Sequence, residues 1–214
     1  MANRVVQFRA SNTIFPRAPI KRMTAAWRAT AGTVIFVLSS IGLGAAQNGP
    51  GDLERITGET VPCIDGRAGI FECRNVELVS FLPVHELGGG PGIGTNDVWG
   101  WTDEENGRDY AIVGLHDRTS FVDVTDVHNP IWLGSLERTE GTRPTLWRDI
   151  KVYGNFAYIV SDSSGRHGVQ VFNLIELRAF AGTPIKFEEF SHYDGIASAH
   201  NIVINKQHPF AYVV

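Results

Sequence analysis

The fold is decided by three stretches that each begin 52 residues after the one before: Asn96-Asp97-Val98-Trp99, Arg148-Asp149-Ile150-Lys151 and His200-Asn201-Ile202-Val203. Strand-like segments at 110–113, 158–160 and 211–214 follow them in the same order. Self-similarity over roughly 40–50 residues with several strands per unit is typical of β-propeller blades, because one twisted sheet cannot bury both faces alone. The sequence therefore predicts an all-β fold: a partial β-propeller of four-stranded antiparallel blades, with two blades and the start of a third.

The first unit predicts four strands, at 98–101, 110–114, 120–125 and 131–134. Asn106-Gly107 predicts a hairpin turn between the first two. The acidic run beside it lacks the twelve-residue pattern between helices that an EF-hand calcium loop needs. Pro130 donates no ladder hydrogen bond, so we expect the fourth strand to be an outer edge. In the second unit, 156–160 and 169–172 are expected strands, and 174–181 is expected to form a short helical turn.

Closed propellers contain roughly four to eight blades. The chain holds two units and the opening strands of another, and Val214 stands inside a predicted strand. We therefore expect the sequence to be a piece of a longer protein.

The first 46 residues have the composition of a secretory signal peptide. Six basic residues and no acidic one precede an apolar stretch at 31–43, and small residues follow it up to Ala46. This pattern predicts cleavage after Ala46, and the apolar stretch is shorter than the roughly 20 residues that span a bilayer. We expect a protein that is secreted, extracellular or displayed at the cell surface, without a transmembrane span. Met1 and Met23 both remain possible starts.

Without this leader the chain carries 13 Lys and Arg against 23 Asp and Glu, a formal charge of −10. Nucleic-acid binding needs clustered Lys and Arg, so an acidic exported body argues against such a partner. Net charge of this sign also keeps an extracellular domain soluble.

The region 47–95 is expected to be a linker with a disulfide loop and a lead-in strand. Cys63 and Cys73 are the two cysteines of the chain, and an even pair that closes a short loop in an exported protein predicts a disulfide. The segment 76–82 alternates like a strand. The glycine-rich segment 88–94 leads into a strand instead of a helix, so it is interpreted as a mobile loop and not as a phosphate cradle.

Several motifs of the chain resemble those of one family. The segment 121–134 is similar to the LVIVD repeat, whose strand ends in an Asp-Val-Ser/Thr-Asp turn followed by Asn-Pro. The other similar motifs are the Cys63–Cys73 loop, Asn96-Asp97-Val98-Trp99-Gly100-Trp101, Trp147-Arg148-Asp149-Ile150-Lys151-Val152, His167-Gly168-Val169-Gln170-Val171-Phe172 and Ser198-Ala199-His200-Asn201-Ile202-Val203. Together they resemble the choice-of-anchor B family of exported bacterial proteins. The resemblance implies an extracellular LVIVD propeller over 96–214, and it implies no catalytic residues.

Candidate binding residues come from the first strand of each unit, which lines the channel of a propeller. One ring of equivalent positions holds Asn96, Arg148 and His200, and the next holds Asp97, Asp149 and Asn201. Alternation sends the two rings to opposite faces, so one of them can border the channel. Arg148, Asp149, His200, Asn201 and Asp97 are therefore the candidate ligand-binding residues.

His200 and Asp149, with His85 from the preceding loop, could bind a divalent metal such as calcium or zinc. The structural alternative is that these polar groups hydrogen-bond loops and fix one blade against the next. The remaining histidines are expected to be exposed or locally bonded.

Three functions are compatible with these features. The first is a non-catalytic binding or scaffold module that recognises a protein or glycan at the cell exterior through loop aromatics: Trp99, Trp101, Trp132 and Trp147. The second is a propeller that binds a metal or small ligand at the channel. The third is a metal-dependent hydrolase or lactonase. The sequence has no G-x-S-x-G elbow, H-E-x-x-H helix or Walker loop, so the first is favoured and no catalytic residue is assigned.

Overall fold

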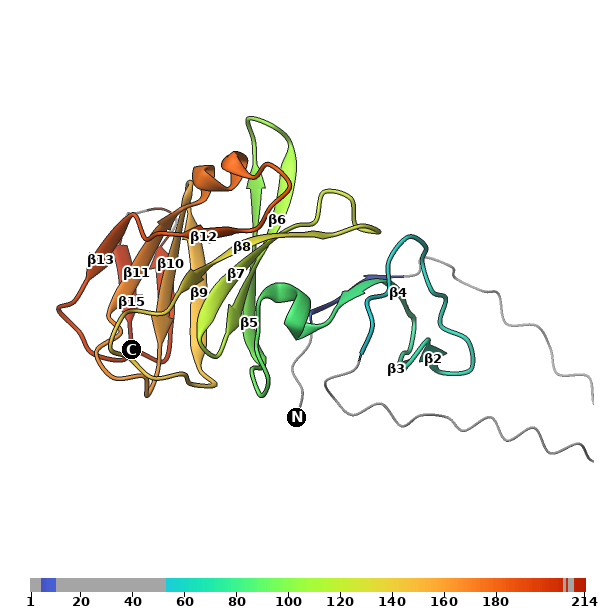
Figure 1. Ribbon diagram of the computed structural model, residues 1–214, viewed down its shortest axis with the longest axis horizontal. Coiled ribbons are helices and arrows are strands. Elements are labelled where there is room, and N and C mark those ends of the chain that lie inside the picture. The colour runs from blue at the N-terminus through green and yellow to red at the C-terminus, as the bar shows by residue number, and fades with distance from the viewer. Residues whose placement is uncertain (1–4, 11–52, 206, 208–209) are drawn as a thin grey trace, which may run out of the picture.

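The computed structural model describes residues 5–10, 53–205, 207 and 210–214. These residues form mainly antiparallel sheets and two short 3-10 helices, η1 (Val84–Leu87) and η2 (Leu174–Ala179). The sheets stand one after another in one body, and a small disulfide-bonded part lies beside them (Figure 1). The all-β class predicted from the sequence is confirmed.

The first sheet contains β5 (Thr95–Asp103), β6 (Arg108–Leu115), β7 (Arg118–Asp123) and β8 (Ile131–Glu137), each antiparallel to the next. The predicted hairpin joins β5 to β6. The backbone N–H of Gly107, with φ 69°, donates to the Asp103 carbonyl at 2.8 Å. The Asn106 side chain accepts from the Arg108 N–H at 2.9 Å.

The second sheet repeats this order with β9 (Arg148–Tyr153), β10 (Phe156–Ser161), β11 (Val169–Asn173) and β13 (Ser191–Tyr193). The hairpin of β14 (Ile202–Asn205) and β15 (Phe210–Val213) follows it. The predicted helical turn after β11 is η2, whose first turn is capped by the Asn173 side chain.

One strand departs from the predicted outline. β12 (Ile185–Phe187) follows η2 but pairs in parallel with β8 of the first sheet, where Ile185 lies opposite Gly134. The expectation that the strand after Pro130 is an outer edge is therefore wrong. Gly134 makes this pairing possible, because a Cβ at that position would lie 1.9 Å from the Ile185 carbonyl oxygen.

The main hydrophobic core fills the space between the first and second sheets. Phe121 and Phe172 stack with ring centroids 4.4 Å apart, and Phe187 of β12 contacts both rings edge-on. Around them lie Ile112, Leu133 and other buried residues of both sheets. Each such side chain stabilises the fold by about 1.5–3 kcal/mol on burial. A smaller cluster joins the second sheet to β14 through Val160, Val169, Ala199 and Ile202.

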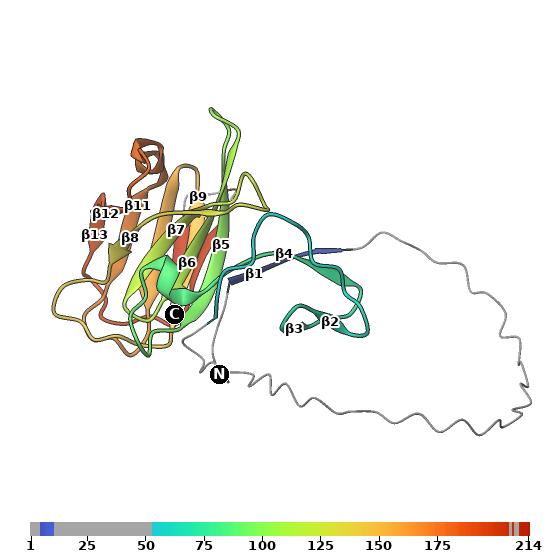
Figure 2. The ribbon, with the colours of Figure 1, turned by 45° about the vertical axis from the view of Figure 1, so that its right-hand side comes forward.

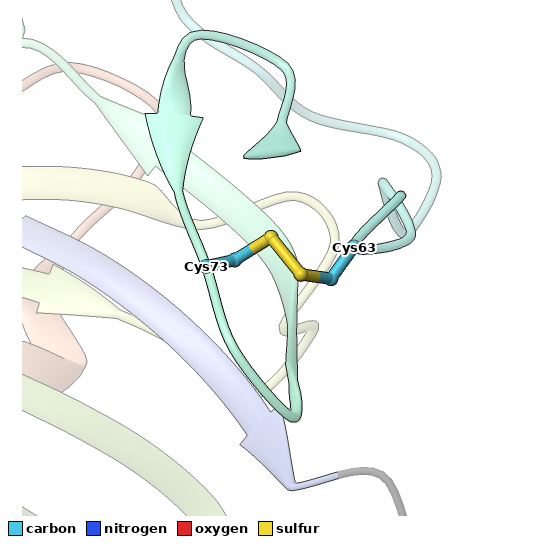
Figure 3. The surroundings of a disulfide bond; sticks show 2 residues. All are labelled: Cys63 and Cys73. Carbon is cyan, nitrogen blue, oxygen red and sulfur yellow. A yellow bond between two sulfur atoms is a disulfide. The ribbon is translucent and has the colours of Figure 1, made fainter. Parts of the chain in front are cut away.

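The disulfide-bonded part surrounds β4 (Val76–Leu82), a strand that the sequence predicted. Cys63 and Cys73 are bonded, as expected, and the loop between them contains the short hairpin of β2 (Arg67–Ala68) and β3 (Phe71–Glu72) (Figure 3). The described part of the predicted linker is hydrogen-bonded to β4. Ile56 and Val61 form bridges with Phe81 and Leu78 of β4.

β1 (Val5–Ala10), within the predicted signal peptide, pairs antiparallel with β4 (Figure 2). The apolar stretch 31–43 and the predicted cleavage after Ala46 lie outside the described residues. Within the described part of the chain, no helix has the length and apolarity to cross a membrane.

Candidate functional site

The candidate site lies where the first strands of the three sheets begin. β5 lies against β9, and β9 lies against β14. β5 and β9 begin at the same end of the sheets, opposite η2 and the tip of the β5–β6 hairpin (Figure 1). The bond between the Asp149 carboxylate and the Ile202 N–H places the start of β14 at this end as well. We call this end the loop face, and it is formed by the segments 88–94, 116–117, 138–147, 162–168 and 194–201.

Two aspartates join the successive sheets by the same bond. Asp97 Oδ2 accepts from the Ile150 backbone N–H at 2.9 Å, and Asp149 Oδ2 accepts from the Ile202 N–H at 2.7 Å. In both bonds the partner lies 53 residues further along the chain. The Asn96 amide adds a bond of 2.9 Å to the Arg148 carbonyl. The equivalent positions therefore carry the inter-sheet contacts that the structural alternative predicted.

Lys151 is the cation between these carboxylates. Its ammonium forms an ion pair with Asp149, lies 4.0 Å from Asp97 Oδ2 and stands 4.7 Å over the ring of Trp99. Burial raises the pKa of Asp97, and the neighbouring Asp149 carboxylate adds to the rise, against the Ile150 hydrogen bond and Lys151, which lower it. Lys151 thus supplies the positive charge beside the Asp97 and Asp149 carboxylates.

The structure does not bring the predicted metal ligands together. His200 turns to Asp162, with Nδ1 3.2 Å from Oδ2, while Asp149 is bonded to Ile202 and Lys151. His85 is an exposed residue of η1. Among the described residues there is no group of three or more His, Cys, Asp and Glu side chains that could hold a metal ion. Asn201 is exposed and pairs through its backbone with Val214.

An exposed aromatic site lies on the loop face. Trp147, at the start of the second sheet, is 48% exposed, and its ring lies 5.7 Å from the His200 ring, centroid to centroid. Leu146 beside it is exposed as well. We call Leu146, Trp147, Asp162 and His200 the Trp147 patch. Of the tryptophans named above as candidates, Trp101 is buried and Trp99 and Trp132 are partly buried.

Backbone bonds hold the Trp147 patch in place. The Trp147 carbonyl accepts from the Asp162 N–H at 3.1 Å and from the Ser161 hydroxyl at 2.9 Å. Thr145 donates its hydroxyl to the Asp162 carbonyl at 2.8 Å. The neighbouring Ser163 adopts a left-handed φ of 55°, which is uncommon for a residue other than glycine. The loop before β9 and the loop after β10 are thereby fixed against each other at Trp147.

The glycine-rich segment is also tied to the loop face. It directly follows η1, a short helix that ends at Leu87. The His116 N–H donates to the Gly94 carbonyl at 3.1 Å, and the Gly94 N–H donates to Nδ1 of the His116 ring at 3.3 Å. A Cβ on Gly94 would lie 2.9 Å from that ring. Its last glycine therefore serves close packing between two loops.

A buried pair was missed by the sequence reasoning. His167 was expected to be exposed or locally bonded; its Nδ1 does lie 3.3 Å from the Gly168 carbonyl, but the residue is fully buried. Its Nε2 lies 3.2 Å from Nη1 of Arg148. Burial, followed by the Arg148 charge, lowers the pKa of His167 to about 4. Burial also lowers the pKa of Arg148 to about 10. Turn-like sequence context gave no signal of this contact, because the two residues meet only through the fold.

The opposite end of the sheets has a cleft that is lined by an ion-pair cluster. Arg178 of η2 binds both carboxylate oxygens of Asp103 at 2.7 Å and Glu105 at 2.7 Å. The Arg178 hydrogen bonds hold the pKa of Asp103 below its usual value. Trp101 and Asn155 line the same cleft. Arg178, Asp103 and Glu105 are paired with each other there, so the Trp147 patch remains the candidate site.

Comparisons of the chain with known protein families, with curated proteins and with solved structures found no match.

Proposed function

We propose that this protein is an exported, non-catalytic binding module whose partner docks on the Trp147 patch. One observation carries the proposal: a half-exposed indole stands on anchored loops, whereas the Asp97 and Asp149 carboxylates are engaged between the sheets. Exposed aromatic rings on fixed supports are the typical anchors of binding surfaces, because little conformational freedom is lost when they bind.

In this proposal the three sheets are consecutive blades of a β-propeller of the LVIVD type. The repeated spacing, the antiparallel order of the first four strands and the adjacent first strands support it. The loop face is then the rim around the central channel, where propellers place their binding loops.

The partner is a protein or glycan at the cell exterior. An indole offers an apolar face to a side chain or a sugar ring. His200 and Asp162 add an imidazole and a carboxylate beside it, with side-chain exposed fractions of 56% and 35%. The metal-binding and hydrolase alternatives have no such observation in their favour, since Asp149 is already bonded to Ile202 and Lys151.

The proposal is tested with the full chain, secreted and immobilised, against envelope proteins, culture medium and a glycan array. The test variant is Trp147→Ala, and Ile131→Ala is the control because Ile131 is equally exposed but lies at the far end of β8. A central aromatic anchor contributes more than about 2 kcal/mol to binding, or roughly 30-fold in affinity.

We expect Trp147→Ala to lose the identified partner and Ile131→Ala to retain it. Equal affinity of the two variants, or no partner for the unaltered protein, contradicts the proposal. Sequencing the N-terminus of the secreted protein checks export separately, and a mature chain that begins at Gln47 is expected.

A further inference from the structure

Beneath the loop face lies a polar layer between the first and second sheets. Arg148, Thr119 and Gln170 each stand two residues before a side chain of the main core: Ile150, Phe121 and Phe172 respectively. Strand alternation therefore directs all three into the space between the sheets. β7, β9 and β11 all begin at the loop face, so the three residues form one layer on that side of the core.

Arg148 is the charge in this layer, and it is 2% exposed. Its side chain lies over Gly114, where a Cβ would stand 3.3 Å from the Cβ and Cδ atoms of the arginine. Gly114 is the register partner of Thr119. The absence of a side chain on Gly114 thus seats the arginine beside Thr119.

The guanidinium is incompletely bonded. Nε donates to the Leu115 carbonyl at 3.1 Å, and Nη1 lies 3.2 Å from His167 Nε2. Nδ1 of this histidine faces the Gly168 carbonyl at 3.3 Å, so Nδ1 carries the proton and Nε2 accepts. A guanidinium has five N–H donors. In the described part of the chain the other donors of Arg148 have no acceptor, and no carboxylate lies within 4.0 Å.

The charges around Arg148 do not balance. Asp117 and Glu137 are the carboxylates whose negative charge acts on Arg148. Both, however, form ion pairs with Arg118, at 2.9 and 3.1 Å. Arg138 adds a further positive charge. Three guanidinium groups thus face two carboxylates. A buried charge without a counter-ion is strongly unfavourable.

Two further polar atoms of the layer are unsatisfied. Thr119 Oγ1 and Gln170 Oε1 are buried and have no hydrogen-bond partner among the described residues. Buried polar atoms are rarely left unpaired, and unpaired ones indicate a bound water or ion. The Thr119 hydroxyl is a donor that an anion can use, and Gln170 Oε1 is an acceptor for a water beside it.

We propose that Arg148 and Thr119 form the centre of a buried binding site for a small monovalent anion of the chloride type. The anion accepts from the free N–H groups of Arg148 and from the Thr119 hydroxyl, and it supplies the missing negative charge between the two sheets. A water bridges it to Gln170. The anion therefore stabilises the contact between the first and second sheets beneath the Trp147 patch.

Thermal unfolding of the full chain at constant ionic strength tests the site, with chloride exchanged stepwise for gluconate, which is too large for a buried layer. We expect the midpoint to rise with chloride and to follow saturable binding. Arg148→Met and Thr119→Val should weaken this dependence, the first by at least about tenfold in apparent affinity, as loss of a charged hydrogen bond implies. Arg108→Met is the control, because Arg108 is an exposed guanidinium at the other end of β6.

Diffraction from crystals grown in bromide gives a readout that does not depend on whether Arg148→Met folds. An anomalous peak within about 3.5 Å of the Arg148 guanidinium is expected. The proposal is overturned if chloride and gluconate give the same midpoints, if Arg108→Met and Thr119→Val respond alike, or if a water alone occupies the layer. None of these measurements involves a partner of the loop face. A negative result would therefore overturn the anion site without bearing on the proposed function, which the Trp147→Ala experiment tests separately.

Discussion

Replacing Asp149 by alanine should separate the second sheet from the third. The substitution removes the acceptor of the Ile202 N–H, which is buried at 2.7 Å from the carboxylate, and it leaves Lys151 without its ion-pair partner. A hydrogen bond to a charged group contributes about 1.5–3 kcal/mol, and a buried N–H left unpaired costs a similar amount. We therefore expect Asp149→Ala to lower the free energy of unfolding by about 2–3 kcal/mol.

Asp149→Asn isolates the charge from the hydrogen bond. The amide oxygen can still accept from Ile202, so the expected loss is the difference between a bond to a charged group, about 1.5–3 kcal/mol, and a neutral one, about 1 kcal/mol: roughly 1 kcal/mol. Urea unfolding gives the stability of each variant. Hydrogen exchange of the Ile202 amide gives the local effect, and its protection should fall in Asp149→Ala more than that of the Ile150 amide, which is bonded to Asp97.

Glu188→Ala is the matched control, because Glu188 is an exposed carboxylate. Surface substitutions of this kind change stability by about 0.5 kcal/mol or less. The reasoning is refuted if Asp149→Ala is no less stable than this control, or if the Ile202 amide keeps its protection in Asp149→Ala.

Three further outcomes are expected. Burial holds the pKa of His167 at about 4, against about 6.5 in the unfolded chain, so the unfolded chain takes up the proton first as the pH falls. Stability that is fully present above pH 6.5 should therefore fall toward pH 4, by at most about 3 kcal/mol. A flat pH profile identical to that of His167→Gln contradicts this. Gly134→Ala should detach β12, since its Cβ would meet backbone at 1.9 Å, whereas Gly100→Ala, with no atom within 4 Å, should not; equal urea midpoints contradict this. Replacing Cys63 and Cys73 by serine should open the loop to limited proteolysis and cost about 3 kcal/mol locally, and unchanged cleavage would count against a structural disulfide.

Local patterns in the sequence predicted the parts of the fold that depend on neighbouring residues. The Asn106-Gly107 turn, the Cys63–Cys73 bond and the strand at 76–82 are each encoded within about a dozen residues, and each is confirmed. Turn chemistry and alternation act at this range.

Contacts between sheets were harder to predict. The 52-residue spacing placed Asp97 and Asp149 at equivalent positions, and Arg148 and His200 at the neighbouring ones, but it could not say which partner each side chain meets. Asp149 bonds to Ile202, whereas His200 bonds to Asp162. Alternation along a strand gives the face of a residue and not its partner.

The crossing of β12 to β8 had no local signal either. The two strands pair in parallel although Gly134 and its partner Ile185 are 51 residues apart. A glycine within a strand does not indicate which strand will pair with it. Tertiary context also decided His167, which stands in a turn-like segment and is fully buried against Arg148 of another strand.

An experimental structure of the full chain, with the rotation between successive sheets measured from it, tests the central claim most directly. The account predicts that the rotation carrying residues 96–99 onto 148–151 also carries 148–151 onto 200–203, with the Asp97 and Asp149 carboxylates bonded to the backbone of the following sheet. Two unrelated rotations, or carboxylates that face solvent at both positions, would contradict it.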